Sequence, residues 1–508
     1  MKDLILATVN DKINSYGVTS GEFAAIAPNI PMGLLDAYVT GQGISSIIMD
    51  ADADNLSFEV EIEKIIDSKP LLVGIIISGS NPSASTQTMG GVIKFFKELN
   101  RRELSFSTFI YGGHPTVLPE RSLKETGADY VVCGEGYETV TQLYKCLAEN
   151  LPLDKVPGLG FFEKDVFRMT PTPPLIDLDD IPQIRWDQMN PNKYKAHNWH
   201  CFDDIENRTP YAIIHTNQGC PYPCEFCCIN NLFEKRTFRF RSMKKVVEEI
   251  DVLVNEYGVK NLKILDELFV IKHPRIDEFC DLLDERGYDL NMWCFARVDS
   301  VTPRILKRLK KVGLNWIAYG FESIDEEVFS TTNKRVKKTS SVQETIDMTR
   351  DAGINIVADV IAGLWLDNEE TILKTRDFLY ANNFEFVNIY PCFAYPGTPL
   401  YDSYIRDGII PVPTNWDTYG LYSYDTIPLP TKHLNPDEVL RLRDEIFSSY
   451  YQDEKILNMI EEKFGIKARD HVKRMAETPL KRKILEPGYD ASKIRYDANN
   501  KFVKLANY

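Results

Sequence analysis

The chain has 508 residues, which is enough for two or three domains of ordinary size. Apolar residues make up 44% of it and charged residues 26%, a mixture typical of a folded, water-soluble protein. Asp and Glu (74) outnumber Lys and Arg (59), and the formal net charge is −15. This acidic balance argues against a broad phosphate-binding surface, so we expect no nucleic-acid partner.

The N-terminal residues MKDLILATVN carry Asp3 beside a short apolar run and do not predict a signal peptide. The longest apolar runs, such as LLVGIIISG at 71–79, are less than half a membrane span. We therefore expect a cytoplasmic protein with no membrane contact. Six cysteines are scattered singly, which predicts reduced and buried thiols at Cys133, Cys146, Cys201, Cys280, Cys294 and Cys392.

Residues 1–150 alternate short apolar runs with amphipathic stretches. The runs predict strands at 4–9, 44–50, 71–78, 107–113 and 130–136. Regular alternation of strand and helix indicates parallel strands joined by right-handed crossovers. Because the strands are almost continuously apolar, both faces of their sheet should be covered. We predict a doubly wound, Rossmann-like α/β domain.

Residues 151–205 are rich in Pro and Asp without a sustained period, and we expect an ordered linker. The α/β alternation returns over residues 206–400, with candidate strands at 211–217, 262–269, 292–299, 316–323, 355–363 and 386–393. Six such units favour a partial (β/α)6 barrel over an open sheet, and active sites of barrels gather at the carboxyl ends of the strands. Residues 401–508 are expected to form a mainly helical region.

The segment HTNQGCPYPCEFCCINN, residues 215–231, directly follows the first strand of the predicted barrel. Cys220, Cys224 and Cys227 have the spacing C-x3-C-x2-C. Three thiolates from one short loop can hold three irons of a [4Fe-4S] cluster and leave the fourth iron open. We assign Cys228 to packing, because its side chain should diverge from that of Cys227. A non-catalytic iron-sulfur or zinc scaffold, with all metal positions closed, stays the alternative.

The run CPYPCEFC resembles the signature of the radical S-adenosylmethionine (radical SAM) enzymes, with Phe226 as its aromatic residue. The resemblance continues through LDELF, ARVD, YGFES, VIAGLWLDNEE and YPGTPLY, in the order in which that superfamily carries such motifs. It implies that Cys220, Cys224 and Cys227 bind a [4Fe-4S] cluster. It further implies a binding site for S-adenosylmethionine formed by Phe226, Glu267, Arg297, Glu322, Ser323, Ile361 and Gly363.

This resemblance assigns a role to each motif. Glu267 would take the methionine amino group, Glu322 and Ser323 the ribose, and Ile361 with Gly363 the adenine. The resemblance implies reductive cleavage of S-adenosylmethionine to a 5′-deoxyadenosyl radical, with the electron coming from a flavodoxin-type or ferredoxin-type partner.

The runs GGHPTVLPE (112–120) and GEGYET (134–139) resemble the cobalamin-binding domain that precedes the barrel in one class of these enzymes. The resemblance implies cobalamin contacts at Ser83, Ser85, Thr86, Gly112, Gly113, Gly134, Glu135 and Gly136. The chain departs from the general cobalamin-binding pattern in one respect. It lacks the D-x-H-x-x-G motif that supplies a histidine ligand, since no histidine precedes His114. Cobalamin would then be held without the histidine ligand of that motif; alternatively, the domain keeps the fold and has lost the cofactor.

Together these resemblances imply a cobalamin-dependent class B methyltransferase. Such an enzyme methylates an unactivated carbon, or a phosphinate phosphorus, of a small molecule or peptide. The alternative enzyme performs cyclisation or rearrangement without methyl transfer. The aromatic stretch at 415–430 has two interpretations, a cover over the barrel mouth or part of a core, and we favour the core.

Overall fold

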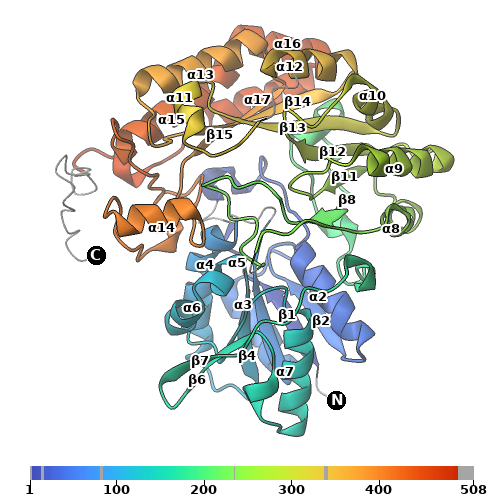
Figure 1. Cartoon of the computed structure of the whole chain (residues 1–508), viewed down its shortest axis with the longest axis vertical. Coiled ribbons are helices and arrows are strands. Elements are labelled where there is room, and N and C mark those ends of the chain that lie inside the picture. The colour runs from blue at the N-terminus through green and yellow to red at the C-terminus, as the bar shows by residue number, and fades with distance from the viewer. Residues whose placement is uncertain (1–2, 13–15, 80–83, 234, 337–340, 490–508) are drawn as a thin grey trace.

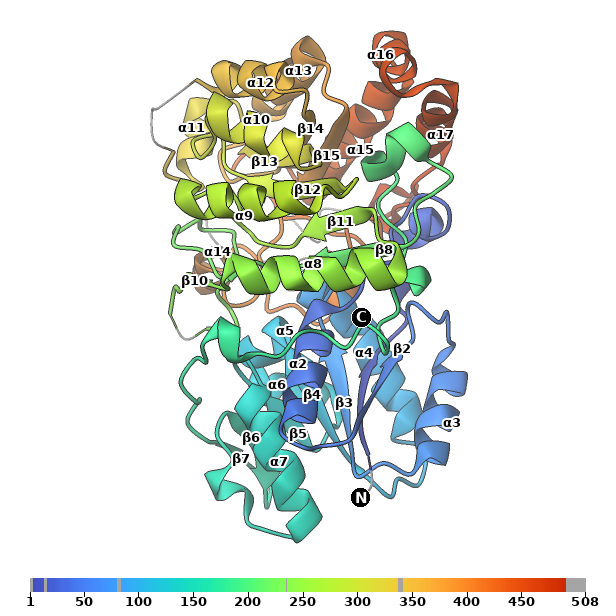
Figure 2. The same cartoon turned by 90° about the vertical axis from the view of Figure 1, so that its right-hand side faces the viewer.

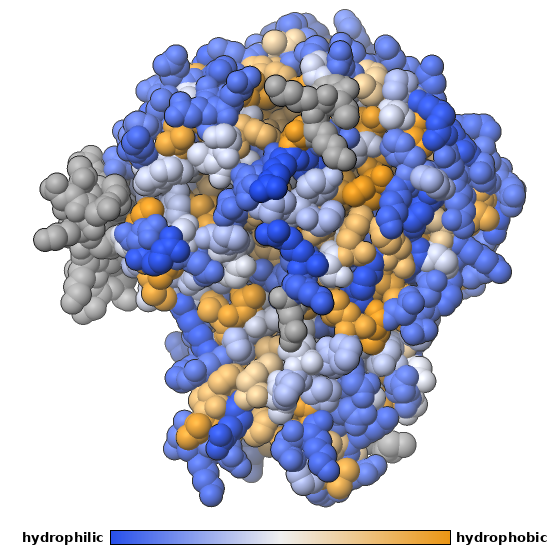
Figure 3. Space-filling view, viewed as in Figure 1, coloured by the Kyte–Doolittle hydropathy of each residue, from blue (hydrophilic) through white to orange (hydrophobic). Residues whose placement is uncertain are grey.

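The protein is described by a computed structural model that covers residues 3–12, 16–79, 84–233, 235–336 and 341–489. Two α/β units lie one above the other along the longest axis, each built on a single sheet (Figure 1). On the face shown in Figure 3, hydrophilic residues dominate, and apolar residues appear as separate patches, some of them near the junction of the two units. None of the helices in the described parts of the chain is long and apolar enough to cross a membrane.

The first sheet has seven strands in the order β2-β1-β3-β4-β5-β6-β7. Its five parallel strands are β1 (Leu4–Thr8), β2 (Ser46–Asp50), β3 (Leu72–Ile77), β4 (Ser107–Gly112) and β5 (Tyr130–Val132). Every residue of β1 and β3 is buried, as expected of a sheet covered on both faces. The predicted doubly wound fold is confirmed.

Helices cover both faces of this sheet. On one face lie α2 (Ile30–Gly41) and α7 (Tyr137–Glu149); on the other lie α3 (Phe58–Ser68), α4 (Ala84–Leu99) and α6 (Pro119–Thr126). A short helix, α5 (Gly113–Val117), follows β4 directly. The strand order changes direction between β1 and β3, and at such a switch point the carboxyl ends of the strands leave a crevice for a ligand.

The segment expected to be a linker, residues 151–205, begins with two strands that extend the first sheet. They are the antiparallel strands β6 (Leu159–Glu163) and β7 (Val166–Met169). The rest of the segment is irregular, with the short helices η3 (Leu178–Asp180), η4 (Pro191–Lys193) and η5 (Trp199–Asp204). A short turn of helix, η2 (Leu153–Lys155), precedes β6. The chain thus completes the first domain before it crosses to the second.

The second sheet has six parallel strands in the order β15-β14-β13-β12-β11-β8, so β8 and β15 form its edges. The strands are β8 (Tyr211–Ile214), β11 (Asn261–Ile264), β12 (Asn291–Ala296), β13 (Leu314–Glu322), β14 (Asn355–Ala362) and β15 (Phe386–Pro391). Each overlaps a predicted strand. The helices between them are α8 (Met243–Tyr257), α9 (His273–Arg286), α10 (Pro303–Lys311), α11 (Glu326–Ser330), α12 (Val342–Asp351) and α13 (Glu369–Asn382). The predicted partial barrel is confirmed.

The C-terminal region is mainly helical, as predicted. Its elements are α14 (Pro399–Arg406), η6 (Trp416–Tyr419), α15 (Pro436–Gln452), α16 (Glu454–Phe464), α17 (Ile466–Glu477) and η7 (Lys483–Leu485). Helix α15 packs along β15, and α16 and α17 pack on α15 (Figure 2). Trp416 and Tyr419 are buried in the core of the first domain, whereas Leu421 and Tyr422 line a cavity of the barrel. The first part of the aromatic stretch therefore belongs to a core, as we favoured.

The N-terminal segment before α2, which includes η1 (Gly17–Ser20), is tied to the start of the barrel. Ile26 and Lys195 exchange backbone hydrogen bonds of 2.9 Å. The buried guanidinium of Arg208 donates to the carbonyl oxygens of Glu22, Ala24 and Ala196, over 2.6 to 2.9 Å. One side chain therefore satisfies three carbonyls from two distant segments.

We predict that Arg208→Met lowers the free energy of unfolding by about 2 kcal/mol, because it leaves the buried carbonyl of Ala196 and the partly buried carbonyls of Glu22 and Ala24 without their donor. Chemical denaturation of the two proteins measures the loss, and limited proteolysis should cut the variant faster before α2. The control is Arg376→Met, which removes an exposed pair with Asp377 and should change stability by less than about 0.5 kcal/mol. Equal stability of Arg208→Met and the wild type would contradict the role given to Arg208.

Candidate functional site

The cysteine loop leaves the barrel at the end of β8 and is fixed there by one carboxylate. Asp266, just beyond β11, accepts hydrogen bonds from the backbone N–H of Thr216 (2.6 Å) and of Asn217 (3.1 Å). It also accepts from the Thr216 hydroxyl and from Nδ2 of Asn217 (2.7 Å). Burial raises the pKa of Asp266 to about 6, although these donors oppose the shift. The ends of the first two barrel strands are thereby held together.

Two short strands close the base of the loop. They are β9 (Asn217–Gln218) and β10 (Arg239–Phe240), which pair in antiparallel fashion. Gly219 has a φ of +84°, and a Cβ at this position would lie 2.3 Å from the Thr237 carbonyl oxygen. Only glycine therefore suits the first bend. Within the loop, Asn230 bonds to both the N–H (3.4 Å) and the carbonyl (3.1 Å) of Cys220.

The four cysteines of the loop differ in their surroundings. Cys220 and Cys224 are half-buried, Cys227 is exposed, and Cys228 is 7% exposed. Across the described residues, no three His, Cys, Asp or Glu side chains converge on a point where one metal ion would sit. A single zinc ion needs such convergence, whereas each thiolate of a cubane cluster binds its own iron. The three thiols on one loop fit a cluster better than a zinc ion.

Charged residues from the strand ends surround the loop. The Arg297 guanidinium, after β12, lies 3.8 Å from the ring centre of Tyr222 on the loop. Burial raises the pKa of the Cys220 thiol to about 11, and the nearby Glu267 carboxylate adds to this shift. Burial also raises the pKa of the Cys224 thiol, and the positive charge of Lys334 opposes this rise. The structure thus brings the predicted groups at β11 and β12 to the cysteines, with Phe226 half-buried on the loop itself.

Glu322, at the end of β13 and predicted to bind the ribose, has a partner that the sequence did not indicate. Lys334 lies 2.6 Å from the Glu322 carboxylate and also donates to the carbonyl of Gly320. A Cβ at Gly320 would lie 2.5 Å from Oε1 of Glu322, so a larger residue would displace this pair. Ser323 is buried beside it. Lys334 lies in a polar stretch, NKRVKK, that carries no recognisable motif.

The predicted adenine motif at the end of β14 forms a tight turn. Asp367 accepts hydrogen bonds from the backbone N–H of Gly363 (3.0 Å) and of Leu364 (2.9 Å). Gly363 has a φ of +96°, and Ile361 is half-buried on the strand before it. Sequence reasoning missed Asp367, whose carboxylate bonds to backbone N–H groups four and three residues before it.

Four of the eight predicted cobalamin residues line a crevice between the two domains. Ser85, Gly112, Gly113 and Glu135 line it from the first domain; Gly219, Cys228, Asp266 and Glu267 line it from the barrel. Its volume is about 120 Å³. Gly134 and Gly136, each with a φ of +79°, flank Glu135, and Ser83 lies outside the described residues. We call this the interdomain crevice.

Several of these side chains are already engaged within the protein. The Ser85 hydroxyl donates to the carbonyl of Ile77 (2.5 Å) and accepts from the N–H of His114 (2.9 Å). Thr86 hydrogen-bonds to Nδ1 of the same histidine (3.1 Å). Glu135 forms an ion pair with Arg239 of the barrel. Ser85, Thr86 and Glu135 therefore hold the walls of the crevice rather than offering free groups to a ligand.

Gly112 and Gly113 differ in the space beside them. A Cβ at Gly112 would lie 2.1 Å from the Ile77 carbonyl oxygen, so the fold itself requires this glycine. A Cβ at Gly113 would meet nothing closer than 3.7 Å, and its backbone borders the crevice. A large ligand could approach the backbone here, at the carboxyl end of β4, one strand away from the switch point between β1 and β3. The place of the crevice fits cobalamin.

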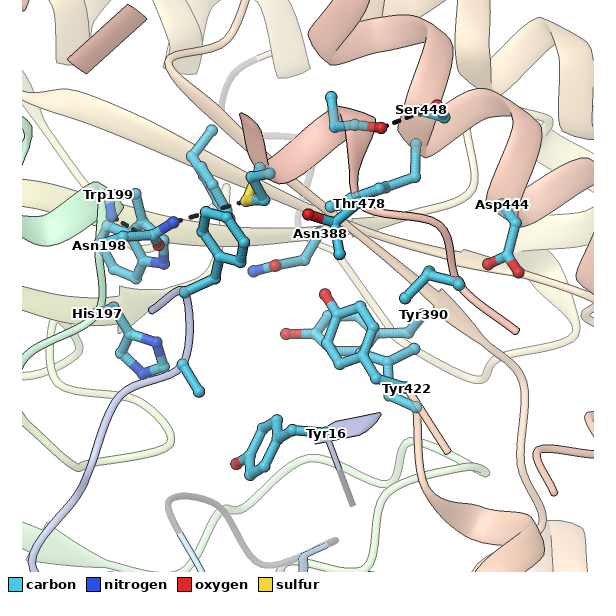
Figure 4. A pocket seen from close by; sticks show the side chains of 18 of the residues that line it. Tyr16, His197, Asn198, Trp199, Asn388, Tyr390, Tyr422, Asp444, Ser448 and Thr478 are labelled. Atoms are coloured by element: carbon cyan, nitrogen blue, oxygen red, sulfur yellow. Dashed lines mark hydrogen bonds between the residues drawn. The ribbon is translucent and has the colours of Figure 1, made fainter. Parts of the chain in front are cut away.

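A second and larger hollow lies inside the barrel. This barrel cavity is partly open, has a volume of about 630 Å³ and is bordered by β11 to β15, the linker, α15, α17 and the N-terminal segment. His197 and Trp199 approach from the linker, while Tyr390 and Tyr422 lie on the opposite side (Figure 4). Its ionisable groups include Lys263 and Asp359 on the strands and Arg441, Asp444, Glu445 and Glu477 on the C-terminal helices, and sequence analysis missed all of them.

Two family models match the chain. The model described as the radical SAM superfamily matches residues 214–379, and the model described as the B12 binding domain matches residues 17–144. The chain is a radical SAM enzyme with a B12-binding domain. The first match covers the cysteine loop and the strand ends around it, and the second covers the first-domain wall of the interdomain crevice.

The enzyme is similar to several named proteins. It is 27% identical over 416 residues to an uncharacterized methyltransferase of Pyrococcus horikoshii, over 81% of this chain and 85% of that protein. It is 28% identical to an anaerobic magnesium-protoporphyrin IX monomethyl ester cyclase of Cereibacter sphaeroides, over 79% of this chain and 63% of the cyclase. This chain thus spans less than two thirds of the cyclase.

Two solved structures share its fold. The radical SAM methyltransferase TsrM of Kitasatospora setae, with cobalamin and a [4Fe-4S] cluster bound, aligns over 94% of this chain and 99% of that one, with a TM-score of 0.67. The cobalamin-dependent radical enzyme OxsB aligns over 94% and 71%, also with a TM-score of 0.67. Sequence identity is 15% in both cases, so the likeness is one of fold.

The cofactors of this radical SAM enzyme are therefore a [4Fe-4S] cluster, S-adenosylmethionine and cobalamin. The three loop thiols suit the cluster, and the interdomain crevice lies at the carboxyl ends of strands of the first sheet, where a doubly wound sheet binds its ligand.

The buried carboxyl of Asp359 gives a pH-dependent prediction. Burial raises its pKa to about 7, well above its usual value, so the folded enzyme favours the neutral acid. Stability from this group is full below about pH 4 and is lost as the pH rises toward 7. Asp359→Asn should therefore stabilise the enzyme more at pH 8 than at pH 5, by on the order of 2 kcal/mol, in denaturant titrations of the protein without cofactors.

The control for this experiment is Asp377→Asn, which changes an exposed carboxylate and should behave alike at both pH values. An equal effect of Asp359→Asn at pH 5 and pH 8 would show that Asp359 does not ionise in that range.

Proposed function

We propose that this enzyme is a cobalamin-dependent radical SAM methyltransferase. Its substrate would be a small molecule or peptide, and the methyl group would go to an unactivated carbon or a phosphinate phosphorus of that substrate. The observation that carries the proposal is the place of the cysteine loop, since Gly219 and Cys228 face Gly112 and Gly113 across the interdomain crevice. The loop thus adjoins the B12-binding domain while it stands at the carboxyl ends of the barrel strands.

Each group of residues has a separate task in this proposal. Cys220, Cys224 and Cys227 would hold the cluster, and Phe226 would pack beside it. Glu267 would accept hydrogen bonds from the methionine amino group, with Arg297 beside it. Glu322 and Ser323 would bind the ribose, and the backbone around Ile361 and Gly363 would border the adenine.

The chain itself supplies orientation and shelter. Lys334 holds the Glu322 carboxylate at 2.6 Å, so the acceptor is positioned before any ligand arrives. Burial raises the pKa of Glu267 to about 8, and a cationic amino group would lower it again on binding. When bound, the cluster and S-adenosylmethionine supply a carbon radical, and cobalamin supplies the methyl group.

For cobalamin we propose backbone contacts at Gly112, Gly113, Gly134 and Gly136. The side chains of Ser85, Thr86 and Glu135 would not contact cobalamin directly. They would keep the walls of the crevice in place. No histidine precedes His114 in this chain, and His114 is buried against Trp416, 4.4 Å between ring centres. We therefore propose that no histidine of the first domain binds the cobalt.

Named relatives support methyl transfer as the outcome. They include a bacteriochlorophyllide d C-8(2)-methyltransferase of Chlorobaculum tepidum and a hopanoid C-3 methylase of Methylococcus capsulatus, each 26% identical. The cyclase of Cereibacter sphaeroides favours a second candidate, cyclisation without methyl transfer.

We also propose a cytoplasmic site of action and a flavodoxin-type or ferredoxin-type electron donor. None of the ten cysteines, all of which lie in the described parts of the chain, forms a disulfide, which suits a reducing compartment.

Methyl-labelled S-adenosylmethionine separates the two candidates. The reduced, reconstituted enzyme should pass the label to its bound corrin and, with substrate, to the product. A turned-over product without label would favour cyclisation and would exclude methyl transfer.

Cysteine variants test the ligand assignment. Cys220→Ala, Cys224→Ala and Cys227→Ala should each abolish formation of 5′-deoxyadenosine, because three thiolates are the minimum that leaves one iron open. Cys228→Ala, the matched control on the same loop, should keep most of the activity. Chromatographic detection of 5′-deoxyadenosine and iron analysis are the measurements. Loss of the cluster in Cys228→Ala together with its retention in Cys227→Ala would reverse the assignment.

A further inference from the structure

The inner wall of the barrel cavity carries an apolar row of side chains that crosses four strands. Phe295, Ala318, Val357 and Phe386 are register partners on β12, β13, β14 and β15, and all four border the cavity. None of these side chains has a polar atom. A ligand that covers this row would therefore gain from burying its own apolar surface.

Aromatic rings stand on two other sides of the cavity. On the linker, His197 stacks on Trp199, with ring centres 5.5 Å apart and 16° between the ring planes. Tyr390 and Tyr422 face this pair across the cavity (Figure 4). Ring faces on opposite sides favour a flat ligand that can stack between them, and a volume of about 630 Å³ is that of a small-molecule site.

The two ionisable groups on the strands are already engaged within the protein. Nζ of Lys263 lies 4.6 Å from the ring centre of Trp293 and 5.3 Å from that of Phe295, and burial lowers its pKa to about 7. Asp359 accepts a hydrogen bond of 2.8 Å from Nδ2 of Asn388, and burial raises its pKa to about 7. Burial thus disfavours the charged form of both groups, and a further charge brought by a ligand would meet the same cost.

The charged groups of α15 at the cavity pair within the C-terminal region. Asp444 forms ion pairs of 2.8 Å with Arg443 and Arg482. Glu445 pairs with Arg441 over 3.1 Å, and both of these side chains are exposed. These carboxylates and guanidinium groups therefore compensate one another and leave no single sign of charge to select a ligand.

The other groups that line the cavity are uncharged or stand in water. Glu477 of α17 is exposed, so solvent screens its charge. Burial lowers the pKa of His197 well below its usual value, so its imidazole is neutral. Gln87, Ser448 and Thr478 add polar groups without charge.

We infer that the barrel cavity is the substrate site, and that the substrate is an uncharged, flat and mainly apolar molecule, such as an aromatic or conjugated ring system. The word substrate rests on the proposed function, whereas the preference for an uncharged ring system rests on the cavity alone. The ligand would be held by stacking and by burial of apolar surface, without an ion pair.

One end of this ligand would lie toward the proposed S-adenosylmethionine site. Asp359 is the register partner of Gly320, whose carbonyl accepts a hydrogen bond from Lys334, the partner of Glu322. The part of the substrate beside Asp359 and its neighbours is therefore the part nearest to the proposed ribose site.

Three fluorescent probes with one aromatic skeleton test the preference for an uncharged ligand. They are 2-anilinonaphthalene, which is uncharged, its 6-sulfonate and its 6-trimethylammonium derivative. Titrations use the full chain with its cluster in place. We expect the uncharged probe to bind at least about tenfold more tightly than either charged probe.

A cavity-filling variant tests whether the probe binds in the barrel cavity. Ala318 lies in the middle of the apolar row, so Ala318→Phe should fill the space above it and weaken binding of the uncharged probe at least about tenfold. Ala318→Leu fills less space and should weaken binding less, which separates a filled cavity from a misfolded protein. The matched control is Ala381→Phe, at an exposed position of α13, which should bind the probe as the wild type does.

Two results would overturn the inference. The first is a sulfonate or trimethylammonium probe that binds as tightly as the uncharged probe. The second is an affinity for the uncharged probe that both Ala318 variants leave unchanged, because the probe would then bind elsewhere. These measurements need no turnover, so they can fail while methyl transfer succeeds, and the reverse.

Discussion

The functional site depends on one buried carboxylate, that of Asp266. It joins the ends of β8 and β11 by four hydrogen bonds to two consecutive residues, Thr216 and Asn217. Those residues begin the loop that carries the cysteines, and the residue after Asp266 is Glu267. A single side chain thus fixes the cluster ligands relative to the proposed partner of the methionine amino group. Burial raises the pKa of Asp266, so keeping its carboxylate charged in this place lowers the stability of the fold.

The two domains meet through contacts that also shape the interdomain crevice. Arg239, at the base of the cysteine loop, pairs with Glu135 of the first domain and donates to the carbonyl of Ile176 in the linker. From the C-terminal region, Trp416 packs on His114, and its indole donates to Glu125 over 2.8 Å. The barrel and the C-terminal region therefore each contact the first domain. The backbone glycines of the interdomain crevice lie between these two contacts.

Much of the fold could be predicted because its signals are local. Buried parallel strands give continuous apolar runs, and all eleven parallel strands fell within or next to the predicted ranges. The second barrel strand was predicted too long, at 262–269, since Leu268 and Phe269 are buried without belonging to a strand. The strands β6 and β7 were missed because β7 is largely exposed and short and shows no apolar run.

The site residues likewise fall into those that the sequence predicted and those that it did not. The cysteines and strand-end motifs were found because their spacing lies within a few residues. Lys334, Arg239 and Asp359 were missed because each acts through a partner that only the fold brings near, such as Glu322, Glu135 and Asn388. Lys263 was missed because a single lysine in an apolar strand has no periodic signature.

The central claim is that three cysteines hold a cluster with one open iron. Mössbauer spectra of the ⁵⁷Fe-reconstituted, anaerobic enzyme, recorded with and without S-adenosylmethionine, test it most directly. The account predicts a [4Fe-4S] spectrum in which one iron site changes when S-adenosylmethionine is added. A spectrum that S-adenosylmethionine leaves unchanged, or a protein that takes up zinc in place of the cluster, would contradict it.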